Sequence, residues 1–131
     1  MKILILGATG PTGQQLLNRA LDQHHEVTVL VRTPSKINFQ HPQLKIIKGD
    51  VLDSQVLLKA MQGQEAVISA LGRGQTLRSS GLITNAVNNI IPAMQELKLK
   101  RLIFLSGFGA GETFAQSNLL QKIIFKTFLI S

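Results

Sequence analysis

The stretch that most constrains the fold is the first thirteen residues, where an apolar run ends at three glycines spaced three apart. Residues 2–6 are aliphatic after the first lysine, which is typical of a strand buried on both faces. Gly7, Gly10 and Gly13 follow, and apolar residues then recur at helical spacing within residues 14–21. This succession predicts a central strand that turns sharply into a helix.

The glycine turn has the features of a phosphate-binding site. A helix that begins directly after a strand points free backbone amides and the positive end of its dipole at an anion. Gly7 would make the tight turn, Gly10 would admit a pyrophosphate close to the backbone, and Gly13 would let the helix approach the strand. Proline suits the first helical position, where no amide is needed, and two threonines add hydroxyl donors. The predicted phosphate-binding residues are Gly7, Thr9, Gly10, Pro11, Thr12 and Gly13.

Further apolar runs predict the rest of the fold. Strands are expected over residues 26–31, 44–48, 65–71 and 101–106, with a helix capped by Asp53 or Ser54 and another over about 81–97. Strands separated by helices favour a parallel sheet with right-handed crossovers. The glycine turn favours the doubly wound α/β arrangement with strand order 3-2-1-4-5. We expect one domain over residues 1–131, truncated at the C-terminus because no sixth strand or substrate-binding part follows.

The charge of the chain predicts an anionic partner. The formal net charge is +7, and residues 32–48 carry four cations and no acid. Nucleic acid is disfavoured because the chain has no tyrosine or tryptophan for base stacking. The apolar run before Gly7 is too short for a signal peptide, and no uncharged run reaches membrane-spanning length. We expect a cytoplasmic protein with a small-molecule substrate, no nucleic acid and no membrane, and leave its oligomeric state open.

The residue at the end of the second strand indicates which nucleotide binds. An acid there accepts hydrogen bonds from the adenosine ribose of NAD, whereas a 2′-phosphate requires cations. Arg32 occupies the position, and Lys36 is a second cation, while Glu26 lies at the opposite end of the strand. NADP is therefore the predicted cofactor, with a solvated surface arginine as the alternative interpretation.

Five segments together resemble the atypical short-chain dehydrogenase/reductases, a family of NAD(P)-binding Rossmann proteins. Within that family the chain is most similar to the flavin/biliverdin-IXβ reductase and NmrA-like branch, and the resemblance covers residues 1 to about 112. The segments are the glycine turn, Val31-Arg32, Gly49-Asp50-Val51, Ser69-Ala70-Leu71-Gly72 and Leu105-Ser106-Gly107.

The resemblance implies roles for residues outside the glycine turn. Asp50 would accept a hydrogen bond from the adenine amine, and the backbone of Val51 would meet the adenine ring. Ser106 would face the nicotinamide, as the one polar candidate for catalysis beside the hydride. Two of these side chains have simpler alternatives, since Asp50 suits the cap of a turn and Ser106 suits a bond to nearby backbone. The implied ribose and pyrophosphate contacts are Ala70, Leu71 and Gly72. In the loop that follows, Arg73 and Arg78 could bind the pyrophosphate or an acidic substrate, although charged loop residues are more often solvated.

The chain lacks the proton donor that most short-chain dehydrogenases use. That donor is a tyrosine with a lysine four residues later, and this sequence has no tyrosine. Asn118 and Lys122 have similar spacing, but a neutral amide is no proton donor. The predicted function is an NADPH-dependent reductase acting on a flat conjugated acceptor: a flavin, tetrapyrrole or quinone. The alternatives are an NADP(H)-binding redox sensor of the NmrA-like type and, last, a nucleotide-sugar epimerase or dehydratase.

Two other features are interpreted as structural. His24 and His25 are adjacent, so on a helix they diverge by about 100° and do not converge on one metal ion. No metal site is predicted. Residues 118–130 are apolar over most of a helical surface, which favours a helix packed on the sheet over one that lies on a membrane surface.

Overall fold

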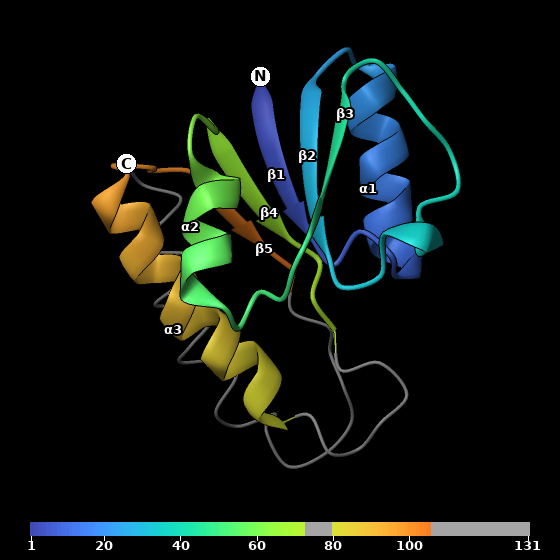
Figure 1. Cartoon of the computed structure of the whole chain (residues 1–131). Helices are drawn as coiled ribbons and strands as arrows, with labels where there is room; N and C mark the ends of the chain where they lie inside the picture. The colour runs from blue at the N-terminus through green and yellow to red at the C-terminus, as the bar shows by residue number, and fades with distance from the viewer. Residues whose placement is uncertain (73–79, 106–131) are drawn as a thin grey trace.

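The computed structural model describes residues 1–72 and 80–105, in which five parallel strands form one sheet with the order β3-β2-β1-β4-β5. This confirms the predicted doubly wound α/β class and its strand order (Figure 1). The strands are β1 (Lys2–Leu6), β2 (Glu26–Val31), β3 (Leu44–Lys48), β4 (Ala66–Ser69) and β5 (Leu102–Phe104). The helices are α1 (Pro11–Asp22), α2 (Ser54–Met61) and α3 (Ser80–Glu96), with a short 3-10 helix, η1 (Pro34–Lys36).

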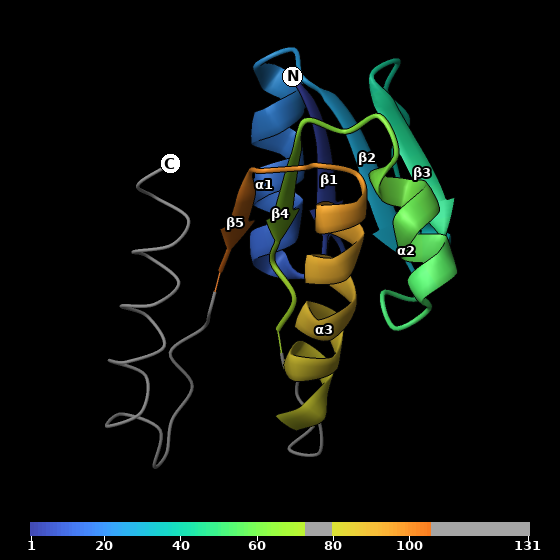
Figure 2. The same ribbon diagram turned by 90° about the vertical axis from the view of Figure 1, so that its left-hand side faces the viewer.

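The described helices cover the two faces of the sheet unequally. Helix α1 lies on one face against β1 and β2, while α2 and α3 lie side by side on the other face (Figures 1 and 2). Alternate residues of β1 therefore enter different cores. Leu4 and Leu6 pack with the α2–α3 side, and Ile3 and Ile5 pack with the α1 side. The continuous apolar run of β1 follows from this burial on both faces.

The ends of several elements differ from the sequence predictions. The strand expected over residues 65–71 spans only Ala66–Ser69, because its neighbour β1 ends at Leu6, which is paired with Ser69. Helix α1 begins at Pro11, as expected of a proline in the first helical turn. Of the two predicted caps of α2, the structure selects Asp53, whose side chain accepts hydrogen bonds from the amides of Gln55 and Val56.

Some predictions lie outside the described residues. These are the catalytic role of Ser106, the contacts of Arg73 and Arg78, the Asn118–Lys122 spacing and the helix expected over residues 118–130. Across residues 1–72 and 80–105, no helix is long and apolar enough to cross a membrane. His24 follows α1 with a left-handed backbone (φ 62°), and Nδ1 of His25 lies 3.1 Å from the N-terminal amine.

Candidate functional site

The first glycine of the turn has a conformation and a neighbour that both require glycine. Gly7 follows β1 with φ +79°, which side chains of L-residues rarely tolerate. A Cβ atom at this position would lie 2.6 Å from the carbonyl carbon and oxygen of Ala70 and 2.8 Å from the amide of Leu71. The end of β1 is therefore pressed against the chain that leaves β4, which brings two further predicted site residues to the turn.

The other two glycines play different structural parts. A Cβ atom at Gly13 would overlap the carbonyl oxygen of Gly7, so α1 can approach β1 only because this residue lacks a side chain. A Cβ atom at Gly10 would have the Gly7 oxygen as its nearest neighbour, at 3.7 Å. The space in front of Gly10 is thus open, as close approach of a ligand to the backbone requires.

The start of α1 is suited to an anion. Gly10 is the N-cap, Pro11 occupies the first turn, and that turn contains no acidic residue. Amides in the first turn of a helix have no partner within the helix and carry the positive end of its dipole. Thr12 is exposed at this end, and Thr9 is half-buried with its carbonyl oxygen accepting a hydrogen bond from Nε2 of Gln14 at 3.1 Å. The geometry therefore fits a phosphate group.

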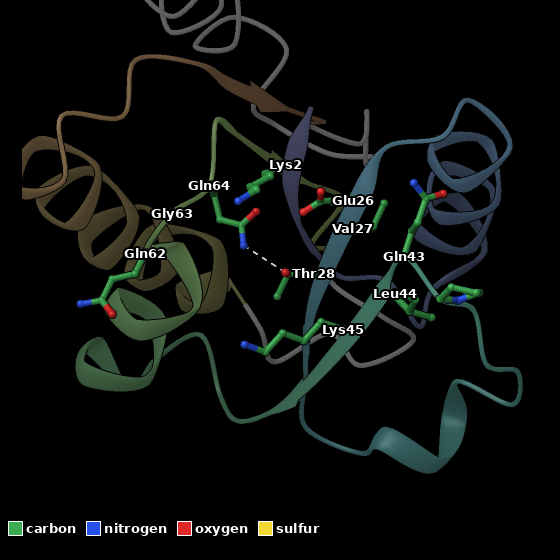
Figure 3. Close-up of a pocket in the computed structure, with 11 residues that line it drawn as sticks. Lys2, Glu26, Val27, Thr28, Gln43, Leu44, Lys45, Gln62, Gly63 and Gln64 are labelled. Atoms are coloured by element: carbon green, nitrogen blue, oxygen red, sulfur yellow. Dashed lines mark hydrogen bonds between the residues drawn. The ribbon is translucent and has the colours of Figure 1, made fainter.

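Two hollows lie at opposite edges of the sheet, and the larger is not at the glycine turn. It measures about 410 Å³ and lies at the amino ends of β1, β2 and β3 (Figure 3). There Nε2 of Gln64 donates to Oγ1 of Thr28 at 3.0 Å, and Oε1 of Gln64 is buried with no hydrogen-bond partner among the described residues. Ligands of doubly wound sheets bind outside the carboxyl ends of the strands, so volume alone does not identify the site.

The smaller hollow, about 90 Å³, lies at the carboxyl edge. It is lined by residues at or just after the carboxyl ends of β1, β2, β3 and β4, because parallel strands all end at this edge. Six predicted site residues are among those that line it, namely Gly7, Thr9, Arg32, Asp50, Val51 and Leu71.

The two predicted cations are placed differently. Arg32 is the first residue after β2, is exposed, and lines the hollow of the carboxyl edge. Lys36 is exposed at the end of η1 and is not among the residues that line this hollow. Gly72 is also exposed and outside the lining. Of the two cations that the sequence predicts as contacts for a 2′-phosphate, Arg32 therefore lines this hollow and Lys36 does not.

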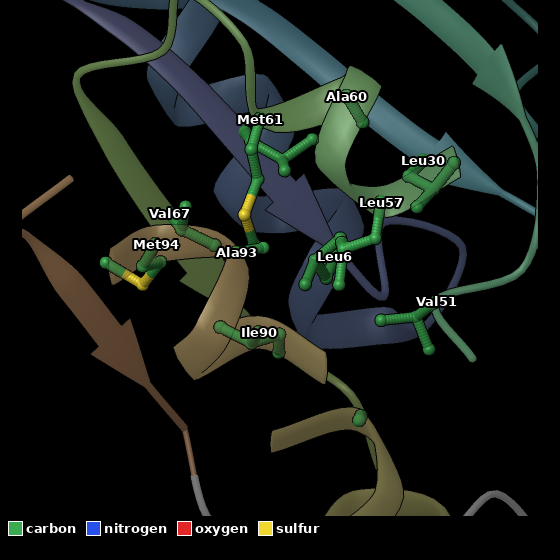
Figure 4. Close-up of a cluster of buried hydrophobic side chains, with 12 residues drawn as sticks. Leu6, Leu30, Val51, Leu57, Ala60, Met61, Val67, Ile90, Ala93 and Met94 are labelled. Carbon is green, nitrogen blue, oxygen red and sulfur yellow. The ribbon is translucent and has the colours of Figure 1, made fainter. Parts of the chain in front are cut away.

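Asp50 stabilises the turn after β3, which is the alternative role that the sequence indicates for this residue. Its Oδ1 accepts a hydrogen bond from the amide of Leu52 at 2.9 Å, and its carbonyl oxygen accepts one from the amide of Asp53 at 3.0 Å. Val51 is buried among apolar side chains that include Leu57 and Ile90 (Figure 4). A carboxylate has further acceptor positions, so this local bond leaves Asp50 able to accept from a ligand as well.

Asn89 is a residue of this region that the sequence interpretation missed. From α3 its Nδ2 donates to the carbonyl oxygens of Val51, at 3.2 Å, and Leu52, at 2.9 Å. The sequence contained one signal for Asn89. It is a polar residue next to Ile90 and three residues after Ala86, and both of these lie on the buried face of the predicted helix.

The chain resembles known proteins over most of its own length. The model of a family described as NAD(P)H-binding matches residues 7–130. The photosystem II assembly factor Ycf39 of Synechocystis is 31% identical over 119 residues, which cover 86% of this chain and 35% of that protein. The phenylcoumaran benzylic ether reductase POP1 of Populus trichocarpa is 30% identical over 117 residues, covering 82% of this chain and 36% of that reductase.

A solved structure agrees with the fold. A Rossmann-fold NAD(P)-binding family protein from Shigella flexneri superimposes with a TM-score of 0.76 and 32% sequence identity, covering 97% of this chain and 62% of the Shigella chain. The chain thus spans about a third of the two curated relatives and less than two thirds of the solved structure. The glycine turn, the parallel sheet and the family match together show that this chain belongs to the NAD(P)H-binding family, an oxidoreductase-like group with the Rossmann fold.

Proposed function

We propose that the chain binds NADP(H) at the carboxyl edge of the sheet and serves as the cofactor-binding part of a reductase. The observation that carries the proposal is that Arg32 lines one hollow together with Gly7 and Thr9, which belong to the turn that leads into α1. The start of α1 would hold the pyrophosphate, and the guanidinium of Arg32 would pair with the 2′-phosphate.

The residues present fit such a dinucleotide. Gly7 and Gly13 bring the strand, the helix and the chain after β4 together, and Gly10 leaves space for the phosphates. Asp50 and Val51 line the same hollow and offer polar groups to the adenine. When bound, the nicotinamide would supply the hydride. The contribution of the described residues is to bind and orient the nucleotide.

The proposed acceptor is a flat conjugated molecule: a flavin, a tetrapyrrole or a quinone. Such acceptors can take a hydride with solvent as the proton source, so residues 1–131, which contain no tyrosine, need not supply a proton donor. The Populus relative is named a reductase, which is consistent with hydride transfer from NADPH. Ser106 stays the predicted polar group beside the nicotinamide.

Calorimetric titration tests the choice of nucleotide. We expect the wild type to bind NADP more tightly than NAD. Arg32→Ala should weaken NADP binding about ten- to a hundredfold, because hydrogen bonds to charged groups contribute about 1.5–3 kcal/mol. The affinity for NAD should stay the same. Lys36→Ala is the matched control and should have the smaller effect, since Lys36 lies outside the hollow. An unchanged affinity for NADP in Arg32→Ala would overturn the assignment.

Stopped-flow loss of NADPH absorbance tests the reductase activity. The full-length protein should oxidise NADPH when a flavin, a tetrapyrrole or a quinone is supplied. If NADPH binds but none of these acceptors is reduced, the reductase proposal fails while the binding proposal stands.

A second candidate is a sensor that binds NADP(H) without turnover and passes the redox state to a protein partner. It is favoured by the relative Ycf39, which is named an assembly factor. A sensor must bind the oxidised and reduced cofactors with different affinities, because only differential binding shifts an equilibrium. Equal dissociation constants for NADP⁺ and NADPH would rule this candidate out.

A further inference from the structure

Asn89 connects α3 to the turn that follows β3. Its carboxamide nitrogen donates to two successive carbonyl oxygens, those of Val51 at 3.2 Å and Leu52 at 2.9 Å. The contact joins residues that lie 38 and 37 positions apart in the sequence. Because both partners are acceptors, only the amide nitrogen can face them, and both of its hydrogens are used. The side chain is therefore fixed in one orientation.

The turn that Asn89 contacts forms one wall of the hollow at the carboxyl edge. Asp50 and Val51 line that hollow, and the rest of the turn is stabilised by local bonds. Oδ1 of Asp50 accepts from the amide of Leu52, and the amide of Asp53 donates to the carbonyl oxygen of Asp50. These local bonds set the shape of the turn and join it to Asp53, the N-cap of α2. Burial of the Val51 side chain and the two bonds from Asn89 attach the turn to α3 as well.

We propose that Asn89 is a positioning residue for the adenine half of the cofactor. By binding the carbonyl oxygens of Val51 and Leu52, it holds the turn where the Asp50 carboxylate faces the hollow. The inference rests on the proposed binding of NADP at this edge and adds a residue that does not itself line the hollow. Asn89 acts through the turn, so its loss should affect recognition of the adenine amine more than binding of the phosphates.

The test uses Asn89→Asp in the full chain. This substitution preserves the size of the side chain and replaces a donor with an oxygen that repels both carbonyl groups. The control is Asn88→Asp, which makes the same charge change at the neighbouring position of α3. Calorimetry measures binding of two probes: NADP, and the analogue whose adenine carries an oxygen in place of the 6-amino group. The analogue lacks the amine that the Asp50 carboxylate would accept from.

We expect the wild type and Asn88→Asp to prefer NADP over the analogue. In Asn89→Asp, binding of NADP should weaken about tenfold, equivalent to about 1.4 kcal/mol, and the preference should disappear. A general electrostatic or stability effect of the new carboxylate would weaken the binding of both probes equally. The ratio of the affinities for NADP and for the analogue would then stay unchanged. That ratio is therefore the readout that separates positioning from a merely structural role.

An unchanged ratio in Asn89→Asp, or a wild type without the preference, would overturn the inference. If the wild type binds neither probe, the proposed cofactor site fails and the role of Asn89 fails with it. If the wild type shows the preference and the variant keeps it, only the role of Asn89 fails. Should Asn89→Asp not fold, Asn89→Ser removes the amide donor without adding charge, and the same ratio decides the outcome.

Discussion

Replacing Gly13 with alanine would place a methyl group inside the contact between α1 and β1. The new Cβ would overlap the carbonyl oxygen of Gly7 and lie 2.7 Å from the Gly7 carbonyl carbon and 2.8 Å from Cα of Ala8. Real Cβ atoms essentially never approach other atoms closer than 3.0 Å. All three contacts are to backbone, so no side-chain rotation relieves them, and the helix and strand must move apart.

The size of the effect follows from two opposing terms. Overpacking a close contact costs about 1–3 kcal/mol, and the rigid backbone here favours the upper end of that range. Alanine recovers up to about 1 kcal/mol through its higher helix propensity. The net loss in the free energy of unfolding is about 2 kcal/mol, which for a chain of this size corresponds to a fall in Tm of about 6–10 °C.

Gly10→Ala is the matched control because it adds the same methyl group three residues earlier. Its Cβ would have only an ordinary contact, 3.7 Å from the Gly7 oxygen. Loss of glycine at the N-cap costs about 0.5–1 kcal/mol, a fall in Tm of about 2–4 °C. The methyl group would instead project into the space proposed for the pyrophosphate. Binding of NADP should weaken about ten- to a hundredfold, because overpacking the methyl group against the pyrophosphate costs about 1–3 kcal/mol.

Thermal unfolding followed by circular dichroism, with calorimetric titration of NADP, measures both effects. We expect a large loss of stability in Gly13→Ala. In Gly10→Ala we expect a small loss of stability and a large loss of affinity for NADP. A Gly13→Ala variant that melts at the wild-type temperature would refute the proposed close packing of α1 on β1. A Gly10→Ala variant that binds NADP normally would refute the approach of the pyrophosphate to this residue.

Substitutions at three further positions test the ends of helices. Asp53→Ala removes the side chain that accepts from the amides of Gln55, at 3.1 Å, and Val56, at 3.2 Å, and should lower the free energy of unfolding by about 1 kcal/mol. Urea denaturation measures this loss, Asp53→Asn should restore most of it, and no change in Asp53→Ala would exclude a capping role. His24→Gly and Lys98→Gly each place glycine where φ is positive, 62° and 56° respectively, and each should raise stability by about 0.5–1 kcal/mol. A lower Tm in either variant would contradict the strain inferred at that position.

The position of much of the candidate site was predictable because it depends on strand ends. Residues that directly follow parallel strands meet at one edge of the sheet, so recognising the strands was enough to bring Gly7, Arg32, Asp50 and Leu71 together. Lys36 shows where this reasoning stops. It follows Arg32 by four residues, but the direction of the chain after β2 depends on η1, which leaves Lys36 outside the hollow.

The sequence by itself determined the sheet, its strand order and the glycine turn, because these can be read from the periodicity of neighbouring residues and from the spacing of three glycines. Only the tertiary structure decided which side chains meet across the sheet and its helices. Gln64 contacts Thr28 over 36 positions, and Asn89 contacts Val51 and Leu52 over 38 and 37. Contacts at such separations depend on the rotation and position at which each helix packs, and no local pattern of residues encodes these.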